Sequence, residues 1–232
     1  MVTKKYKLTD ETIKVNDRIL YRIEALKDFS DVKKGDKGGY VEKEENLSQY
    51  GDSWVYDDAR VFGNAVVYYN ARVYGNAKVY DKARVYGYAR VYGIAQVFDN
   101  AKVYGTAKVY GKAQVYDNAQ VYWYAQVLDN AEVCGNAEVC GGAEICGNAK
   151  LYGNMEIGED AIIASNSDYI VFKNWWSSGR YFTWTRSNNM WKVGCFYGTG
   201  EQLIEKAYKD SELSGREYER VVRYVESIIK DN

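Results

Sequence analysis

Between Val55 and Ile162, the hydrophobic and polar positions of the chain repeat with a period of six residues. An aliphatic residue opens each of the eighteen hexads, and Ala fills the fifth place in all but one, which has Met155. The order Ala, polar, aliphatic, aromatic alternates inward and outward side chains, as a strand does. The remaining two places are mostly Gly-Asn or Asp-Asn, which enter left-handed backbone conformations at low cost and so form corners. A strict period of six predicts a parallel β-helix.

Three strand-and-corner units close one triangular coil of eighteen residues, so the hexads predict about six coils over residues 54–164. At 4.8 Å between stacked strands, this prism is about 29 Å long. The aliphatic and Ala columns fill its interior. Burial of each Val or Ile contributes on the order of 1.5–3 kcal/mol, which makes the interior columns the main source of stability.

The hexads, with Val or Ile first and Ala fifth, resemble the hexapeptide-repeat superfamily, whose fold is a left-handed β-helix. A second resemblance, to uncharacterised hexapeptide-repeat proteins of bacteria, phages and prophages, is carried by Leu26-Lys27-Asp28-Phe29, Asp31-Val32-Lys33, Gly38-Gly39-Tyr40-Val41-Glu42, Asn46-Leu47-Ser48-Gln49 and Gly51-Asp52-Ser53-Trp54-Val55-Tyr56. These resemblances imply a homo-oligomer, with a trimer favoured. For a phage-encoded chain they also imply a place in the host cytoplasm and a host protein as partner.

Many members of that superfamily are acyltransferases and some are zinc carbonic anhydrases, and both mechanisms use histidine. The chain contains no histidine, so neither mechanism can be carried over, and we predict no catalytic, cofactor-binding or metal-binding residues. Cys134, Cys140 and Cys146 fall on three different faces of one coil, too far apart for a disulfide or a zinc site.

Outside the hexads the chain changes character. Residues 1–53 contain two strand-like runs around Asn16-Asp17 and are predicted to cap the open end of the coil. Residues 165–232 are predicted to form a small α+β domain with strands at 168–173, 181–185 and 191–196. Thr199 is expected to cap one helix, and a second helix is expected over 215–230, where apolar residues fall on one face.

Charge is nearly balanced, with a net charge of −1, but it is ordered along the chain. The polar place between Ala and Val reads Arg72, Lys78, Arg84, Arg90, Lys102 and Lys108, then Gln114, Gln120 and Gln126, then Glu132, Glu138 and Glu144. Because the basic side chains surround the rod, we expect no nucleic-acid partner. No apolar run approaches the roughly 20 residues that span a membrane, and no signal-peptide core follows the first residues, so we expect a cytoplasmic protein.

Three sets of outer residues are candidates for contacts. Tyr and Phe form columns on all three faces, and these columns either stabilise neighbouring coils or bind a partner. One corner column departs from Gly-Asn and carries large side chains, Tyr69, Tyr88, Trp123 and Tyr124. A neighbouring subunit, the folded-back C-terminal domain or a foreign partner would cover them, unless they are neutral substitutions at a solvated corner.

The C-terminal domain holds a third set, Trp175, Trp176, Arg180, Trp184, Arg186 and Trp191. Aromatic residues with Arg are typical of binding hot spots, but about half of this set is also needed for the core of a domain with few Leu or Ile.

The sequence therefore favours a non-enzymatic rigid scaffold or binding protein that acts through protein–protein contacts, such as inhibition of a host or defence factor. The alternative is a small-ligand or nucleotide-binding protein, or an acyltransferase-like enzyme without the usual histidine. Such a protein would have a pocket between subunits or beside the Trp and Arg residues of the C-terminal domain.

Overall fold

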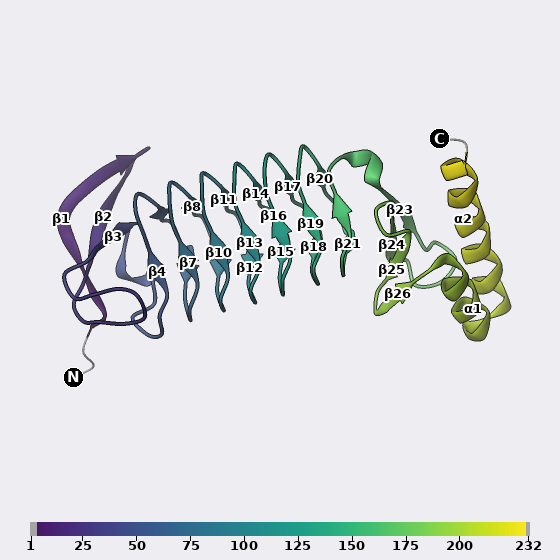
Figure 1. The fold of residues 1–232 in the computed structure, drawn as a ribbon, viewed down its shortest axis with the longest axis horizontal. Coiled ribbons are helices and arrows are strands. Elements are labelled where there is room, and N and C mark those ends of the chain that lie inside the picture. The colour runs from purple at the N-terminus through teal and green to yellow at the C-terminus, as the bar shows by residue number, and fades with distance from the viewer. Residues whose placement is uncertain (1–3, 231–232) are drawn as a thin grey trace.

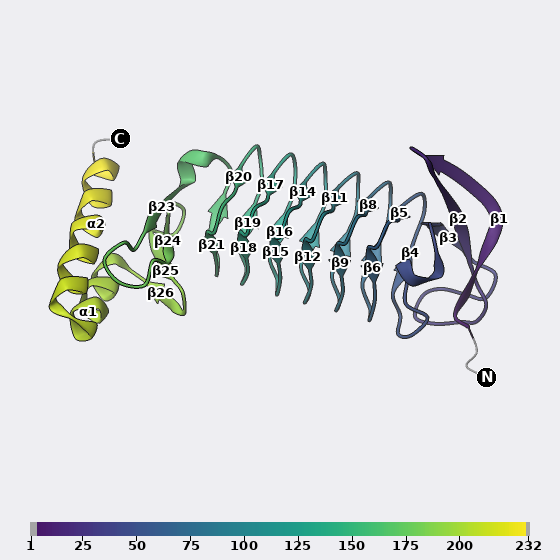
Figure 2. The ribbon, with the colours of Figure 1, turned by 180° about the vertical axis from the view of Figure 1, so that it is seen from behind.

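The computed structural model describes residues 4–230 and shows a rod (Figure 1). A β-solenoid of about seven turns forms its middle, an N-terminal sheet closes one end, and a small α+β domain with two helices lies at the other. The view from behind shows the same order along the rod (Figure 2). None of the described helices is long and apolar enough to cross a membrane.

The N-terminal sheet is joined to the solenoid through one shared strand. β1 (Tyr6–Val15) and β2 (Arg18–Ala25) form an antiparallel hairpin that turns at Asn16, where φ is 53°. β3 (Lys37–Val41) pairs antiparallel with β2 and parallel with β5 (Arg60–Val61). After a 3-10 turn, η1 (Glu44–Asn46), Leu47 bridges to Val67, so parallel stacking begins before the first hexad.

Three sheets form the faces of the solenoid, and the solenoid strands within each sheet are parallel. The nine-stranded sheet continues from β1, β2, β3 and β5 through β8 (Lys78–Val79), β11 (Gln96–Val97), β14 (Gln114–Val115), β17 (Glu132–Val133) and β20 (Lys150–Leu151). The seven-stranded sheet contains β4 (Trp54–Val55), β7 (Arg72–Val73), β10 (Arg90–Val91), β13 (Lys108–Val109), β16 (Gln126–Val127), β19 (Glu144–Ile145) and β22 (Ile162–Ile163). The six-stranded sheet contains β6 (Val66–Val67), β9 (Arg84–Val85), β12 (Lys102–Val103), β15 (Gln120–Val121), β18 (Glu138–Val139) and β21 (Glu156–Ile157).

The register confirms a coil of eighteen residues. Val91, for example, pairs with Val73 on one side and with Val109 on the other. The aliphatic and Ala columns are buried along the whole solenoid and form one continuous core. Strand hydrogen bonds run along the axis, as from the Arg90 amide to the Ala107 carbonyl at 2.9 Å, so the backbone groups of each coil are satisfied by the next.

The C-terminal domain follows a 3-10 turn, η2 (Asn166–Asp168). Its sheet has four antiparallel strands, β23 (Tyr169–Lys173), β24 (Tyr181–Thr185), β25 (Met190–Val193) and β26 (Phe196–Gly198). Its helices are α1 (Gly200–Asp210) and α2 (Glu212–Lys230).

Three expectations for this domain can be compared with the structure. The strand expected over 191–196 is wrong, because Gly194, at φ 54°, turns the chain between β25 and β26. The second helix begins at Glu212, three residues earlier than expected. The Thr199 cap is confirmed, since its hydroxyl accepts a hydrogen bond from the Gln202 amide.

Candidate functional site

The solenoid has three edges, each made of corner pairs one coil apart. We call the pairs 69–70, 87–88, 105–106, 123–124 and 141–142 the aromatic edge. The pairs 63–64, 81–82, 99–100, 117–118, 135–136 and 153–154 form the aspartate edge, and the third edge runs from 57–58 to 147–148. The first residue of every pair has a positive φ, between 51° and 75°, which favours Gly, Asn or Asp.

Aspartates at the corners stabilise the coil that follows. Asp117 on the aspartate edge accepts a hydrogen bond from the Gly135 amide at 2.9 Å. On the third edge, Asp57 and Asp129 bind the amides of Gly75 and Gly147 in the same way. These aspartates therefore have a structural role at the turn.

On the aromatic edge, Thr106 donates a hydrogen bond to the Trp123 carbonyl at 2.8 Å, but the large aromatic side chains do not have this role. Tyr69 and Trp123 occupy the left-handed position, at φ 59° and 57°, although this conformation costs an L-residue about 1–2 kcal/mol. Tyr69, Tyr88, Trp123 and Tyr124 are 61%, 64%, 55% and 72% exposed. Within residues 4–230, none of these four side chains makes a hydrogen bond. The C-terminal domain lies at the end of the rod (Figure 1), and the exposure of the four side chains shows that it does not cover them.

Two kinds of side chain flank the aromatic edge. A tyrosine directly precedes each of the first four corners. These residues, Tyr68, Tyr86, Tyr104 and Tyr122, stack as a ladder from coil to coil, with 4.9 Å between neighbouring ring centroids. Its rings also meet the corner residues, with Tyr122 and Trp123 edge to face at 5.3 Å. After each corner the seven-stranded sheet presents Arg72, Arg90, Lys108, Gln126 and Glu144 in successive coils.

A small polar cavity of about 210 Å³ lies at the basic end of this edge. It is lined by Ser30, Asp52, Asn70, Arg72, Tyr88 and Arg90. Arg72 is already engaged, with a 2.9 Å ion pair to Asp31 and a 2.9 Å hydrogen bond to Ser30. Arg90, in contrast, is exposed and has no ion pair with a described residue.

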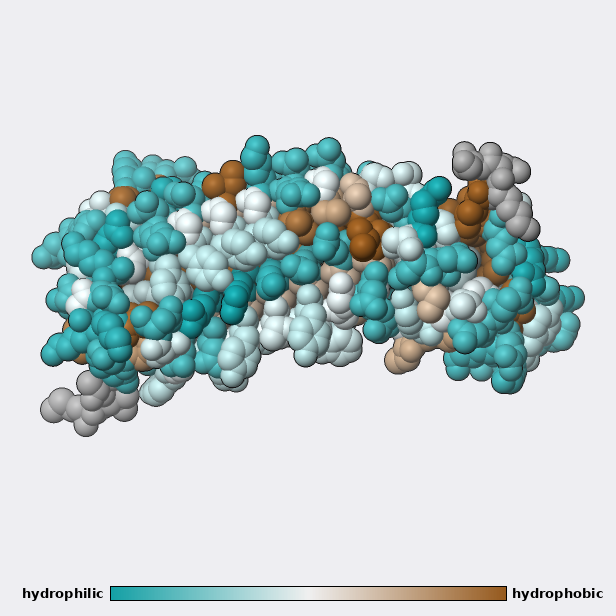
Figure 3. All heavy atoms as spheres, in the orientation of Figure 1, coloured by the Kyte–Doolittle hydropathy of each residue, from teal (hydrophilic) through white to brown (hydrophobic). Residues whose placement is uncertain are grey.

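The aromatic ladders on the three faces fit a structural role. Rings stack at 4.9 to 5.0 Å along the columns that begin at Phe62 and Tyr68, as between Phe62 and Tyr80 at 5.0 Å. In the third column Tyr92 and Tyr110 stack at 4.8 Å, whereas Tyr56 meets Tyr74 edge to face at 5.7 Å. Their tyrosines are half-buried, and burial raises the pKa of Tyr104 to about 12. On the face drawn in Figure 3, hydrophobic residues lie in small groups among hydrophilic ones, without one broad apolar patch.

The Trp and Arg set of the C-terminal domain does not form one surface. Trp184 and Trp191 are each 2% exposed and belong to the core with Phe182. Trp176 is half-buried and packs edge to face on Tyr218, with 4.9 Å between the ring centroids. Trp175 is 75% exposed, and Arg186 is exposed as well. Three of the six residues therefore hold the domain together.

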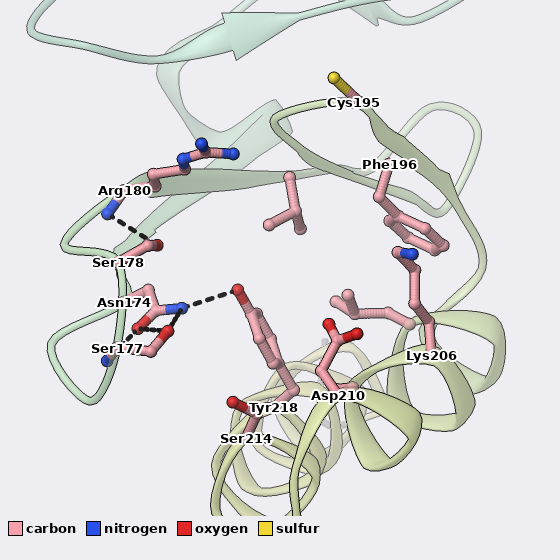
Figure 4. A pocket seen from close by; sticks show the side chains of 13 residues that line it. Asn174, Ser177, Ser178, Arg180, Cys195, Phe196, Lys206, Asp210, Ser214 and Tyr218 are labelled. Carbon is pink, nitrogen blue, oxygen red and sulfur yellow. Dashed lines mark hydrogen bonds between the residues drawn. The ribbon is translucent and has the colours of Figure 1, made fainter.

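Arg180, the remaining member of the set, lines a cavity of about 280 Å³ between the sheet and the helices (Figure 4). On one side, the loop after β23 supplies the buried Asn174, which donates hydrogen bonds to Tyr218 at 3.0 Å and to Ser177 at 2.9 Å. On the other side, α1 supplies Lys206 and Asp210. Burial raises the pKa of Tyr218, so this hydroxyl stays protonated at neutral pH.

Three charged side chains of this cavity, Arg180, Lys206 and Asp210, have no ion pair with any residue in the described part of the chain. The sequence did not point to the residues of α1 and α2 that meet here, because they lie in amphipathic helices without a motif. Among the described residues, no group of three or more Cys, Asp or Glu side chains is placed to hold a metal ion. Cys134, Cys140, Cys146 and Cys195 are free thiols.

Comparison with known proteins supports the architecture. The YdcK beta solenoid repeat matches residues 55–69 and 71–87, which cover most of the two coils that begin at β4. No curated protein matches the chain. The fold and this match define the class of the molecule, which is a β-solenoid repeat protein.

Proposed function

We propose that this protein is a rigid, non-catalytic binding protein and that the aromatic edge is its contact surface. The observation that carries the proposal is Trp123, a large aromatic residue held in a left-handed corner and 55% exposed. Strain of this kind persists at positions where function requires it. Exposed Trp and Tyr are also the residues that most often anchor protein–protein interfaces.

Site-specific photo-crosslinking tests this proposal. A benzoylphenylalanine placed at Tyr124 is compared with one placed at Asn118. Both positions are the second residue of a corner pair in the same coil, but Asn118 lies on the aspartate edge. We expect covalent adducts from position 124 and not from position 118 when the protein is irradiated in its cells. Equal yields at the two positions, or no adduct at position 124, would remove the aromatic edge as a contact surface.

The partner that binds the aromatic edge is either a foreign protein or a second copy of this chain, and the mass of the cross-linked adduct distinguishes the two. The resemblance of residues 26–56 to phage and prophage proteins supports a host or defence protein. A second copy of the chain is the other source, and an adduct of twice the chain mass identifies it.

A second candidate function is the binding of a small polar ligand in the C-terminal cavity. Its support is the convergence of Arg180, Lys206 and Asp210, three charged groups without ion pairs among the described residues, on one cavity. Native mass spectrometry of gently purified protein tests it. A reproducible adduct that disappears in Arg180→Ala supports this function, and a bare chain mass in both proteins contradicts it.

A further inference from the structure

The aromatic edge has an ordered sequence of charge along its length. The side chain that follows each corner is Arg72, Arg90, Lys108, Gln126 and then Glu144, so the sign changes at Gln126. Arg90 is exposed, and Lys108 and Glu144 are partly exposed. Inside residues 4–230 none of these three forms an ion pair. Their charges are therefore available to a partner along this edge.

The size of the corner residues also changes at the coil of Gln126. Trp123 and Tyr124 occupy the corner of the coil that contains Gln126. One coil to either side, the corners are small, Gly105-Thr106 and Gly141-Gly142. Large side chains thus stand at the centre, and the small corners on both sides leave room for a partner's backbone to come close.

We infer that a second copy of this chain binds the aromatic edge in the antiparallel direction, about a two-fold axis at the level of Trp123. The inference rests on the proposed function, because it names the partner of the same edge. A rotation of 180° about an axis across the rod reverses the direction of the solenoid. Each coil on one side of the axis then faces the coil equally far on the other side in the second copy.

Charge complementarity follows from this rotation. Lys108, one coil before the axis, faces Glu144 of the second copy, one coil after it. Arg90, two coils before the axis, faces the level of Glu159 and Asp160, which are both exposed. Both copies have the same 4.8 Å repeat, so all pairs come into register together. Each pair occurs twice, as a two-fold interface requires.

A parallel assembly of this edge would have the opposite electrostatics. With all chains in one direction, as in a trimer about an axis along the rod, Lys108 would stand at the height of Lys108 and Glu144 at the height of Glu144. Like charges across an interface are unfavourable, whereas opposite charges steer association and fix the register. The central aromatic residues, which become buried, supply most of the affinity.

Charge reversal combined with analytical ultracentrifugation tests the inference. We expect a dimer of the 26.6 kDa chain whose dissociation constant rises about tenfold in Lys108→Glu and in Glu144→Lys. The double variant Lys108→Glu/Glu144→Lys recreates both pairs, so its dissociation constant returns to within about threefold of the wild type. Lys102→Glu, at the matching place of the six-stranded sheet near the aspartate edge, is the control and leaves the dimer unchanged.

Other outcomes overturn the inference. A trimer, or single reversals that the double variant does not rescue, contradicts the antiparallel pair. A monomer that still forms an adduct with another protein through position 124 contradicts the second copy and leaves the binding function in place. A monomer without any adduct at position 124 contradicts both. Circular dichroism of each variant checks that the solenoid stays folded.

Discussion

Replacing Trp123 with Gly tests whether this corner residue stabilises the solenoid or binds the second copy of the chain. The substitution relieves a left-handed conformation that costs an L-residue about 1–2 kcal/mol. Against this gain, Gly adds about 0.5–1 kcal/mol of backbone entropy loss, and the edge-to-face contact with Tyr122 contributes about 0.5–1.5 kcal/mol. Trp123 is more than half exposed, so its packing lies at the low end of that range. The free energy of unfolding should stay within about 1 kcal/mol of the wild type.

The assay pairs thermal denaturation with the dimer dissociation constant. For a chain of this size, 1 kcal/mol shifts the melting temperature by about 2–4 °C, so Trp123→Gly should melt within that interval. Its dissociation constant should rise at least about tenfold, as for the loss of a central aromatic anchor. Val121→Ala, at a fully buried position two residues away, is the matched core control and should cost about 2 kcal/mol.

Two results would refute the reasoning on Trp123. A drop in melting temperature as large as that of Val121→Ala would show that Trp123 stabilises the solenoid. An unchanged melting temperature together with an unchanged dissociation constant would show that the corner is neutral for both folding and assembly.

Three further predictions concern stability. Val91→Asp places an unpaired carboxylate in the solenoid core and should unfold the middle coils. The control Val66→Asp, on the outer side of β6, should leave the melting temperature within a few degrees of the wild type. Equal effects of the two variants would contradict the inward assignment of Val91. Asp117→Ala removes the hydrogen bond from the Gly135 amide and should cost about 1–2 kcal/mol in chemical denaturation, so an unaltered midpoint would contradict its role in the turn. Burial lowers the pKa of Lys5 from 10.5 to about 8, so the unfolded state binds this proton more tightly and Lys5 adds stability as the pH rises above 8. Burial raises the pKa of tyrosines such as Tyr104, which act in the opposite direction near pH 10, so the wild type should gain stability relative to Lys5→Met between pH 8 and about pH 9. An equal pH dependence of the two proteins would exclude this role of Lys5.

The solenoid could be predicted from sequence because each coil repeats the same local information. Every aliphatic first place and Ala fifth place faces the same interior, so a period of six residues determines register, burial and the stacking of the outer rings together. The prediction was incomplete where this repeat weakens. Leu47 and Val55 are eight residues apart, and this longer spacing hid the coil that β3 and Leu47 complete.

The C-terminal domain was less predictable because its contacts join residues that are distant in sequence. Asn174 meets Tyr218 forty-four residues away, through a loop that packs against α2. Neither residue belongs to a motif, so the cavity depends on packing that no local pattern reveals. The turn at Gly194 was missed because Gly within an apolar run also fits a strand.

The distribution of charge around the solenoid became clear only from the positions of the side chains in the structure. In the sequence, the basic and acidic side chains fall on all three faces of the rod, which argues against any single binding groove. In the structure, the polar place of each hexad lies just after a corner, so each edge has its own column of charges. The aspartate edge adds carboxylates of its own at Asp81, Asp99 and Asp117, and these offset the basic column beside them. From position 69 to position 142 the aromatic edge has no charged corner residue. Arg72 is paired with Asp31, but Arg90 and Lys108 have no ion pair with a described residue. Trp123 and Tyr124 lie between Lys108, one coil before them, and Glu144, one coil after them. This charge order is self-complementary only when reversed, which is why an antiparallel copy fits it better than a parallel one.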